Sequence, residues 1–258
     1  MYYFSGTGNN LAIAQKLANL LGNTDILPIR HLLDHKTIPS EYTWVGFCTP
    51  SYYSHVPPFV QECMENLIFT NEQKIFTIVG CGGNRGLAHL DMRKQIEAAS
   101  KKVQLEYMIS LPGSYILSYS AFPDVYSKLT TSFSYKKIEQ IAKAIQSDSD
   151  PISLKTGMFY TASREAELQK NIASYNEVCQ GYTISNSCKH CGICAKVCPT
   201  QNITLQNGQV SFGENCQQCM AYIQWCPQRA IDYKGKASSR KRYHHINISL
   251  KDMTQYNA

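Results

Sequence analysis

Seven cysteines in the last third of the chain have the type and spacing that metal-cluster chemistry requires. The first run reads Cys188-Lys-His-Cys191-Gly-Ile-Cys194-Ala-Lys-Val-Cys198-Pro199, a complete C-x2-C-x2-C-x3-C-P pattern. Three closely spaced thiolates can surround one small cube from a single tight loop, whereas the fourth cysteine, placed before a proline, ligates the other cluster of a pair. The spacing therefore predicts two iron–sulfur clusters.

The second run departs from this pattern at one position. It reads Cys216-Gln-Gln-Cys219-Met-Ala-Tyr222-Ile-Gln-Trp-Cys226-Pro227, with Tyr222 where the third cysteine would stand. When the fourth ligands are exchanged between the runs, a first 4Fe–4S cluster has the ligands Cys188, Cys191, Cys194 and Cys226. The second cluster is left with Cys198, Cys216 and Cys219. We expect a 3Fe–4S cluster there, or a 4Fe–4S cluster whose fourth iron binds water, a small ligand or an oxygen of the chain.

Zinc and disulfides are the alternatives for these cysteines. Structural zinc sites usually take four ligands in pairs separated by a longer spacer. Four cysteines within eleven residues fit that arrangement poorly. Disulfides are disfavoured because the start of the chain does not look like a signal peptide, so we expect a reducing, cytoplasmic location.

Residues 181–233 resemble two-cluster bacterial ferredoxins. The resemblance implies a small α+β domain of two pseudo-repeats, each with a short strand, a cluster loop and a small helix. Ile203 and Ile231 each follow the last cysteine of a run by five residues, which agrees with a duplicated half.

A second set of candidate binding residues lies at the start of the chain. The strand-like run Met1–Phe4 leads into Ser5-Gly6-Thr7-Gly8-Asn9-Asn10, and apolar residues at helical spacing follow at Leu11, Ala14, Leu17, Ala18 and Leu21. Backbone N–H groups and hydroxyls of such a loop can bind phosphate at a helix N-terminus. The loop has neither Lys nor Arg and matches neither a nucleotide P-loop nor a dinucleotide fingerprint. We expect a monophosphate held by neutral donors, and a tight turn without a ligand is the alternative.

Strand-like and helical stretches alternate over residues 1–150. The further strand-like runs are Ile26–Ile29, Val45–Cys48, Ile75–Gly80 and Val103–Ile109, and the helical stretches are Pro57–Asn66, Leu87–Ser100 and Tyr135–Gln146. This alternation predicts an α/β fold with a parallel sheet covered on both faces. Five strands fit the flavodoxin-like doubly wound arrangement, in which the ligand lies beyond the carboxyl ends of the strands where their order reverses.

Two loops at those carboxyl ends suit a flat, aromatic ligand. Pro50-Ser51-Tyr52-Tyr53-Ser54 offers aromatic faces for stacking, and Gly82-Gly83-Asn84 offers backbone that can approach a ring edge closely. Residues 1–150 thus resemble a flavodoxin domain. The resemblance implies bound FMN, with Ser5 to Asn10 at its phosphate, Tyr52 or Tyr53 stacked on the ring, and Gly82, Gly83 and Asn84 at the pyrimidine edge. We interpret His55 as a polar loop residue, Cys81 as a candidate flavin contact, and Cys48 and Cys63 as packing thiols.

The remaining segments are interpreted from composition. We expect residues 151–180 to form a connector with one helix, about Arg164 to Val178, and Cys179 is a fallback cluster ligand. Residues 151–258 contain 12 basic side chains and 6 acidic ones. The basic tail at 234–258 is solvated or docks an acidic redox partner such as a ferredoxin or flavodoxin, and residues 246–258 add an edge strand. We expect no nucleic acid partner, because no recognition module accompanies the charge, and no membrane span, because no apolar run is long enough.

The whole chain resembles the flavodoxin/ferredoxin fusion proteins of anaerobic bacteria and archaea, and Tyr222 is its departure from them. The resemblance implies electron transfer between the clusters and FMN and onward to a redox partner. The cluster with four thiolates should have the lower reduction potential, because a site with three cysteines carries less negative charge. An FMN-dependent reductase fed by the clusters, and a regulatory module with structural or sensory clusters, stay open as alternatives.

Overall fold

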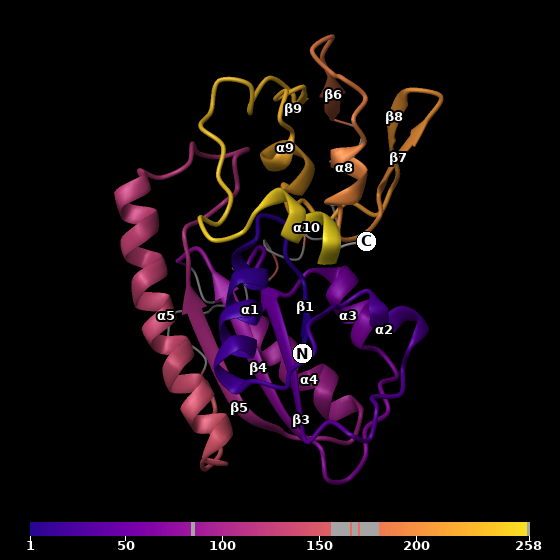
Figure 1. Cartoon of the computed structure of the whole chain (residues 1–258). Coiled ribbons are helices and arrows are strands. Elements are labelled where there is room, and N and C mark those ends of the chain that lie inside the picture. The colour runs from indigo at the N-terminus through magenta and orange to yellow at the C-terminus, as the bar shows by residue number, and fades with distance from the viewer. Residues whose placement is uncertain (84–85, 156–165, 167–169, 171–180, 257–258) are drawn as a thin grey trace.

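A computed structural model describes residues 1–83, 86–155, 166, 170 and 181–256 (Figure 1). Its larger part is a five-stranded parallel sheet with the strand order β2-β1-β3-β4-β5. The strands are β1 (Tyr2–Tyr3), β2 (Leu27–Pro28), β3 (Trp44–Pro50), β4 (Lys74–Cys81) and β5 (Val103–Ser110). This is the strand order of flavodoxin-like doubly wound sheets, so the predicted fold class is confirmed.

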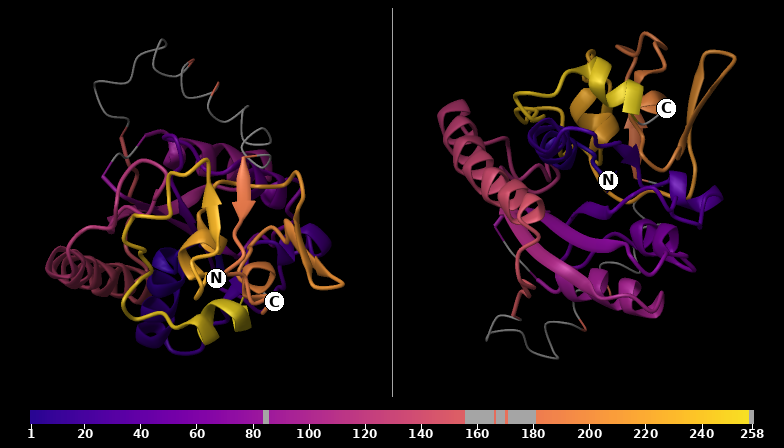
Figure 2. Two further views of the ribbon diagram at one scale, coloured as in Figure 1. Left: turned by 90° about the horizontal axis from the view of Figure 1, so that it is seen from above. Right: turned by 60° about the horizontal axis from the view of Figure 1, so that its bottom comes forward.

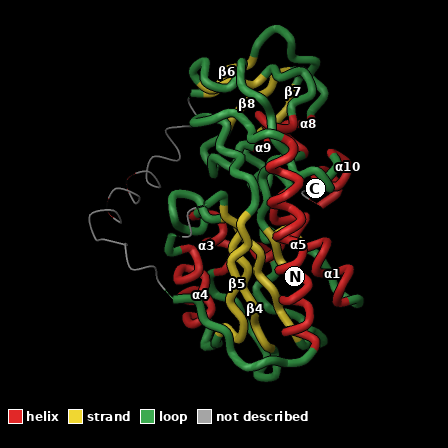
Figure 3. The backbone as a smooth tube through the Cα atoms, turned by 90° about the vertical axis from the view of Figure 1, so that its left-hand side faces the viewer, coloured by secondary structure: helices red, strands yellow, loops and turns green. Residues whose placement is uncertain are grey.

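Helices cover both faces of the sheet, as parallel strands buried on both sides require. Figure 3 shows α1 and α5 on one face and α3 and α4 on the other. The helices of this part are α1 (Asn9–Leu21), α2 (His31–Asp34), α3 (Pro58–Met64), α4 (Ala88–Ala98) and α5 (Asp124–Gln146). Phe47 and Ile78 of the central strands are fully buried between these layers, together with Leu11 and Leu17 of α1.

The last helix of the sheet begins earlier than the sequence predicts. Its periodic apolar face starts near Tyr135, whereas α5 begins at Asp124. Val125, Leu129 and Phe133 in its first half are more than half exposed, so this part of the helix buries no continuous apolar stripe. The amphipathic signal that marks a helix in a sequence is therefore confined to the second half of α5.

A smaller region lies above the carboxyl ends of the strands (Figures 1 and 2). The short strands β6 (Tyr182–Ile184) and β9 (Ile231–Tyr233) pair antiparallel, and β7 (Ile203–Gln206) and β8 (Gln209–Phe212) form a hairpin. The cysteine runs lead into two short helices, α8 (Ile193–Lys196) and α9 (Ala221–Trp225). Trp225 and Val197 of this region belong to the same buried hydrophobic cluster as the sheet.

The C-terminal segment folds back onto both parts. Its charged side chains at Lys234, Lys236 and Lys241 are exposed, but Tyr243 and Ile248 are buried. It ends in the helix α10 (Leu250–Tyr256), so the expected edge strand at 246–258 is wrong. The alternation of Ile246, Ile248 and Leu250 arises from a turn in which Ile248 is buried and Ile246 is half exposed. The division of the chain at residues 150, 180 and 233 stays a prediction, as do the helix near Arg164 and the role of Cys179, which lie largely outside the described residues.

Candidate functional site

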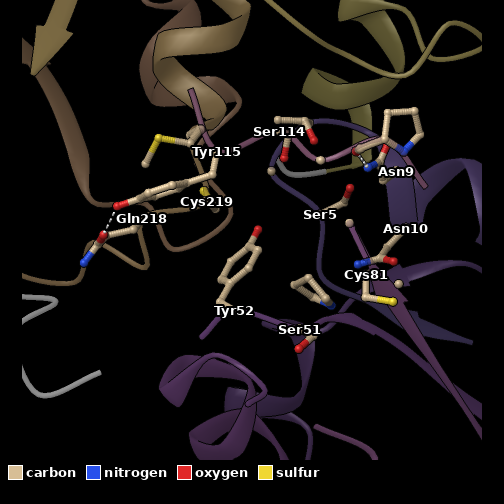
Figure 4. Close-up of a pocket in the computed structure, with 18 of the residues that line it drawn as sticks. Ser5, Asn9, Asn10, Ser51, Tyr52, Cys81, Ser114, Tyr115, Gln218 and Cys219 are labelled. Carbon is tan, nitrogen blue, oxygen red and sulfur yellow. Dashed lines mark hydrogen bonds between the residues drawn. The ribbon is translucent and has the colours of Figure 1, made fainter. Parts of the chain in front are cut away.

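The cavity at the carboxyl ends of the strands encloses about 250 Å³. Its walls come from the loops that follow β1, β3, β4 and β5, and from the second cysteine run (Figure 4). Most of the residues predicted to bind a flavin line it: Ser5, Gly6, Thr7, Asn9, Asn10, Pro50, Ser51, Tyr52, Tyr53 and Gly82. The structure thus brings together loops that are far apart in the sequence, as the carboxyl-end rule for parallel sheets predicts.

The loop between β1 and α1 presents small, buried polar groups at the start of a long helix. Ser5 and Thr7 are almost fully buried, and Gly8 precedes α1 in the left-handed region with a φ of 89°. Among the described residues, the buried Asn10 Oδ1 and Ser51 Oγ have no hydrogen-bond partner. Both residues line the cavity. Since buried polar atoms are normally satisfied, these two atoms fit a site that a polar ligand completes.

The C-terminal segment holds this loop from behind. The backbone N–H of His245 donates to the carbonyl of Thr7 at 2.9 Å, and the hydroxyl of Tyr243 donates to Asn9 Oδ1 at 2.7 Å. A Cβ on Gly8 would stand 3.0 Å from the side chain of Ile248. No local pattern predicts this support, because the residues involved are more than 230 positions apart.

The aromatic loop after β3 is a tight turn. The backbones of Tyr52 and His55 exchange two hydrogen bonds, of 2.8 and 3.0 Å, across Tyr53 and Ser54, whose φ values of 48° and 70° are left-handed. This geometry places Tyr52 and Tyr53 at the cavity. His55 Nδ1 lies 2.9 Å from Asp91 Oδ2 and the ring is buried. His55 therefore anchors the turn to α4, which agrees with its interpretation as a polar loop residue.

The loop after β4 contributes less than the sequence predicts. Cys81 and Gly82 line the cavity, and a Cβ on Gly82 would stand 2.9 Å from the Cα of Gly113. Gly83 has a φ of 137° and open space around it, and among the described residues it is not part of the lining. Asn84 lies outside the described residues. Its expected contact with a flavin edge stays a prediction.

Two groups of lining residues are not among those predicted from the sequence. Pro112, Gly113, Ser114 and Tyr115 follow β5, and Gln218 and Met220 flank Cys219. The first group was detectable, since it follows the last strand of the sheet just as the other three loops follow theirs. The second group was not detectable, because it depends on how the cysteine region packs against the sheet.

A cluster of three polar side chains joins the two groups. The hydroxyls of Tyr53 and Tyr115 lie 2.9 Å apart, and each lies 3.0 Å from Gln218 Oε1 (Figure 4 shows Tyr115 and Gln218). Burial raises the pKa of both phenols above its usual value. The phenols are therefore neutral, and Gln218 Oε1 accepts the single proton of each hydroxyl.

The second cysteine run packs directly on the phosphate-loop candidate. A Cβ on Gly6 would lie 2.2 Å from the carbonyl oxygen of Cys219, so only glycine fits there without displacing backbone. The indole N–H of Trp225 donates to the carbonyl of Gly6 at 3.0 Å in a buried hydrogen bond. The loop that carries Cys219 thus forms one wall of the cavity.

The cysteines predicted to hold the first cluster share one small cavity. Cys188, Cys191, Cys194 and Cys226 all line a space of about 20 Å³, whose other walls are mainly apolar. Cys226 reaches it from the second run, which is the exchange that the spacing predicts. Cys191 is exposed and the other three are half-buried, so this site lies near the surface.

The cysteines predicted to hold the second cluster are more deeply placed. Cys198, Cys216 and Cys219 are each at most 5% exposed. Burial raises the pKa of the Cys198 and Cys219 thiols. The hydroxyl of Tyr222 lies 3.0 Å from Cys216 Sγ, in a buried contact. Among the described residues, no group of three or more His, Cys, Asp or Glu side chains is arranged so that it could hold a metal ion. The assignment of cluster ligands is therefore a proposal, taken up below.

The two cysteine runs have similar backbone geometry, with Cys216 in the second run equivalent to Cys188 in the first. His190 and Gln218 are left-handed at φ values of 52° and 50°. Their backbone N–H groups donate to Cys188 Sγ and Cys216 Sγ at 3.5 and 3.4 Å. Further along, the backbone N–H groups of Asn202 and Ala230 donate to Cys198 Sγ and Cys226 Sγ at 3.3 and 3.4 Å. Such donors stabilise thiolates and help to set cluster potentials, so the loops fit iron–sulfur ligation.

Comparison with known proteins agrees with part of this picture. Residues 182–204 match the 4Fe–4S binding domain family. The match spans the first cysteine run, and the second run lies outside it. No curated protein matches the chain. The chain is also similar to a crystal structure of an FMN-dependent NADH-azoreductase from Bacillus anthracis str. Ames Ancestor in complex with FMN. The identity is 12% and the TM-score 0.31, over 53% of this chain and 73% of that one.

Within the part of the chain that the structure describes, no helix has the length and apolar character needed to cross a bilayer.

Proposed function

We propose that this chain is an electron-transfer protein, in which iron–sulfur clusters held by the seven cysteines exchange electrons with FMN in the cavity and with a separate redox protein. Iron–sulfur clusters exchange one electron at a time, whereas a flavin accepts one or two. The chain's part is to hold these groups close together and to insulate them from water.

One observation carries the proposal. The segment from Gln218 to Met220 contains Cys219, a predicted ligand of the second cluster, and also lines the cavity. Its backbone lies against Gly6 of the predicted phosphate loop. A cluster at this position and a flavin in the cavity would share a wall one residue thick, which favours direct transfer between them.

The burial of the cysteines supports a direction for the path. The first site is nearer the surface, because Cys191 is exposed, and the second site is buried beside the cavity. We therefore propose the sequence external carrier, first cluster, second cluster, flavin. Exposed lysines at positions 234, 236 and 241 come after β9 in the chain. This strand pairs with β6, the strand that precedes the first cysteine run. An acidic carrier would be attracted to such a surface, and the attraction would weaken with added salt.

The cavity suits the flavin end of this path. The neutral loop Ser5–Asn10 at the N-terminus of α1 would hold the phosphate. Tyr52 would cover the ring, and the unpartnered Ser51 Oγ and Asn10 Oδ1 would bond polar atoms of the ligand. A cytoplasmic location and the division into a flavin domain (1–150), a connector (151–180), a cluster domain (181–233) and a C-terminal segment remain part of the same proposal.

Anaerobic purification of the whole chain, followed by assays for flavin, iron and sulfide, tests the proposal. We expect bound FMN, together with iron and acid-labile sulfide. Stopped-flow reduction by a chemically reduced ferredoxin should then reduce the clusters before the flavin. Colourless protein, or zinc in place of iron and sulfide, would refute the proposal.

A pair of cysteine variants tests the path. Cys191→Ser removes an exposed ligand of the first site, and Cys63→Ala removes a buried thiol in α3 that has no assigned role. Cys191→Ser should leave FMN content unchanged and slow flavin reduction by the protein donor at least tenfold. Cys63→Ala should leave that rate unchanged. Equal rates in both variants would show that electrons reach the flavin without the first cluster.

An FMN-dependent reductase is the second candidate, and the Tyr53–Tyr115 pair favours it. Both phenols are neutral, and a hydroxyl that turned away from Gln218 Oε1 could donate its proton to a reduced substrate beside the flavin. Steady-state turnover of quinones or nitroaromatics separates the two functions. A reductase would lose most of its kcat in the Tyr53→Phe, Tyr115→Phe double variant, whereas a carrier would keep its rate of flavin reduction.

A further inference from the structure

Tyr222 occupies the position in the second cysteine run that Cys194 occupies in the first. Both follow a left-handed residue, Gly192 or Met220, and both lie in the short helix that comes next. Cys194 lines the first site. The repeated backbone geometry therefore directs the side chain of Tyr222 toward the second site.

The ring of Tyr222 is held in one place by aromatic packing. It is 2% exposed, and it meets Tyr182 edge-on at a centroid distance of 5.0 Å and Phe212 at 5.6 Å. This packing leaves the hydroxyl 3.0 Å from Cys216 Sγ. A water molecule in place of the missing thiolate would have to displace part of this buried aromatic cluster.

The length of the tyrosine side chain decides what it can do there. A cysteine sulfur is one bond beyond Cβ, whereas the phenol oxygen lies at the far end of a ring. From the same backbone position, the phenol extends past the point of a cysteine sulfur and into the space of the iron that the sulfur would bind. Ligands of neighbouring irons radiate from different corners of a cluster, so an oxygen in hydrogen-bond contact with Cys216 Sγ is badly placed to ligate another iron.

We propose that Tyr222 closes the fourth corner of the second site, so that Cys198, Cys216 and Cys219 hold a 3Fe–4S cluster, and that its hydroxyl donates a hydrogen bond to Cys216. This inference rests on the proposed function and selects one of the two cluster types expected at the second site. A Cys216 thiolate bound to iron carries no proton, so the phenol must be the donor in this contact.

The consequence concerns the direction of electron flow. A cluster with three thiolates carries less negative charge than one with four, and a hydrogen bond to a thiolate further stabilises the reduced form. Both effects raise the potential of the site beside the flavin cavity. Electrons entering at the first, four-cysteine site would therefore move inward.

Four forms of the whole chain, prepared without oxygen, test the inference: wild type, Tyr222→Phe, Tyr222→Ala and Tyr222→Cys. Wild type should contain about seven iron atoms per eight sulfides, as one cluster of each kind implies, and should show the EPR signal of an oxidised 3Fe–4S cluster. Tyr222→Phe should keep both properties, because its ring still fills the corner, but its second-site midpoint potential should be lower.

The other two variants separate a blocked corner from a merely missing ligand. With excess ferrous iron and reductant, the Tyr222→Ala protein should take up a fourth iron at the second site and lose the EPR signal, whereas wild type should keep the signal. Tyr222→Cys should reach about eight iron atoms per eight sulfides without this treatment. If Tyr222→Cys does not fold, the comparison of wild type, Phe and Ala variants still decides.

Equal iron and sulfide in wild type, without the 3Fe–4S signal, would overturn the inference while leaving the proposed function in place. Iron uptake by wild type as rapid as in the Ala variant would also overturn it. An unchanged second-site midpoint potential in Tyr222→Phe would show that the Tyr222 hydroxyl donates no hydrogen bond to Cys216 that affects the cluster. Protein without iron or sulfide would instead refute the proposed function, and the inference with it.

Discussion

The contact between Gly6 and Cys219 makes the sharpest prediction, because it joins the predicted phosphate loop to a predicted cluster ligand. In Gly6→Ala, the new Cβ would lie 2.2 Å from the Cys219 carbonyl oxygen and 2.8 Å from its Cβ. Ordinary contact begins near 3.4 Å, so the two loops must separate by about 1 Å at this point. Overpacking of this kind typically costs about 1–3 kcal/mol in the free energy of unfolding.

The same displacement should also affect FMN binding and electron transfer. Trp225 bonds the carbonyl of Gly6, so the loop cannot move without weakening that hydrogen bond as well. We expect Gly6→Ala to lower FMN affinity about tenfold, which corresponds to about 1.4 kcal/mol. Transfer from the clusters to the flavin should also become slower. Urea unfolding, FMN titration of the apoprotein and stopped-flow reduction measure the three effects.

Gly22→Ala is the matched control. Gly22 follows α1 with a φ of 82°, and nothing lies within 4 Å of the position of its Cβ. At Gly22 ψ is −131°, a backbone conformation that alanine rarely adopts, and the strain costs about 1–3 kcal/mol without touching the cavity. Gly22→Ala should lower stability comparably and leave FMN affinity and flavin reduction unchanged. If the Gly6 variant behaves like the Gly22 variant in all three assays, the proposed coupling through this contact is wrong.

Three further predictions concern stability. Glu106 is 1% exposed, and its carboxylate accepts two hydrogen bonds from Arg93, of 2.7 and 2.5 Å, so Arg93→Met should cost about 3–5 kcal/mol in urea unfolding by leaving a buried charge; a loss below 1 kcal/mol would contradict this reading. Gln218→Leu removes the acceptor of two part-buried tyrosine hydroxyls and should cost about 1–3 kcal/mol, whereas Gln218→Glu, which keeps an acceptor, should cost less. Burial lowers the pKa of His245 from 6.5 to about 4, and its Nδ1 accepts the backbone N–H of Asn247. Between these two pH values the unfolded chain binds the proton more readily than the folded one, so stability falls on acidification through this window, by up to about 3 kcal/mol below it. His245→Gln should flatten that part of the pH profile of urea unfolding, and an unchanged profile would show that another group is responsible.

The sheet was predictable because its strands are buried on both faces. Runs such as Val45–Cys48 and Ile75–Gly80 are apolar apart from the buried Thr77, and this pattern does not depend on the details of side-chain packing. The phosphate-loop candidate was predictable for a similar local reason, since a strand, a loop of small residues and a helix follow one another within 21 residues. The start of α5 was not predictable, because the buried positions of its first half are the small polar residues Ser127, Thr131 and Ser134, which give no periodic apolar face.

The grouping of cysteines from the two runs also depends partly on local spacing and partly on long-range packing. Spacing alone grouped Cys226 with the first run, and the structure places it in the same small cavity as Cys188, Cys191 and Cys194. The spacing of the second run also identified Tyr222 as the exception, because the position of the third cysteine is found by counting residues within one loop. It could not reveal that the phenol contacts Cys216, because that contact depends on how Tyr182 and Phe212 pack around the ring.

Local order along the chain was therefore enough to predict the fold class and the loops at the carboxyl ends of the strands, and to propose the seven cysteines as cluster ligands. Long-range packing was needed to bring Cys219 against Gly6, to carry Tyr243 and His245 behind the phosphate-loop candidate, and to bury one cysteine site while leaving the other near the surface. Ligand spacing and strand burial are imposed by bond lengths and by the residues next in sequence. Contacts across some 200 residues depend on which surfaces fit each other after both have folded.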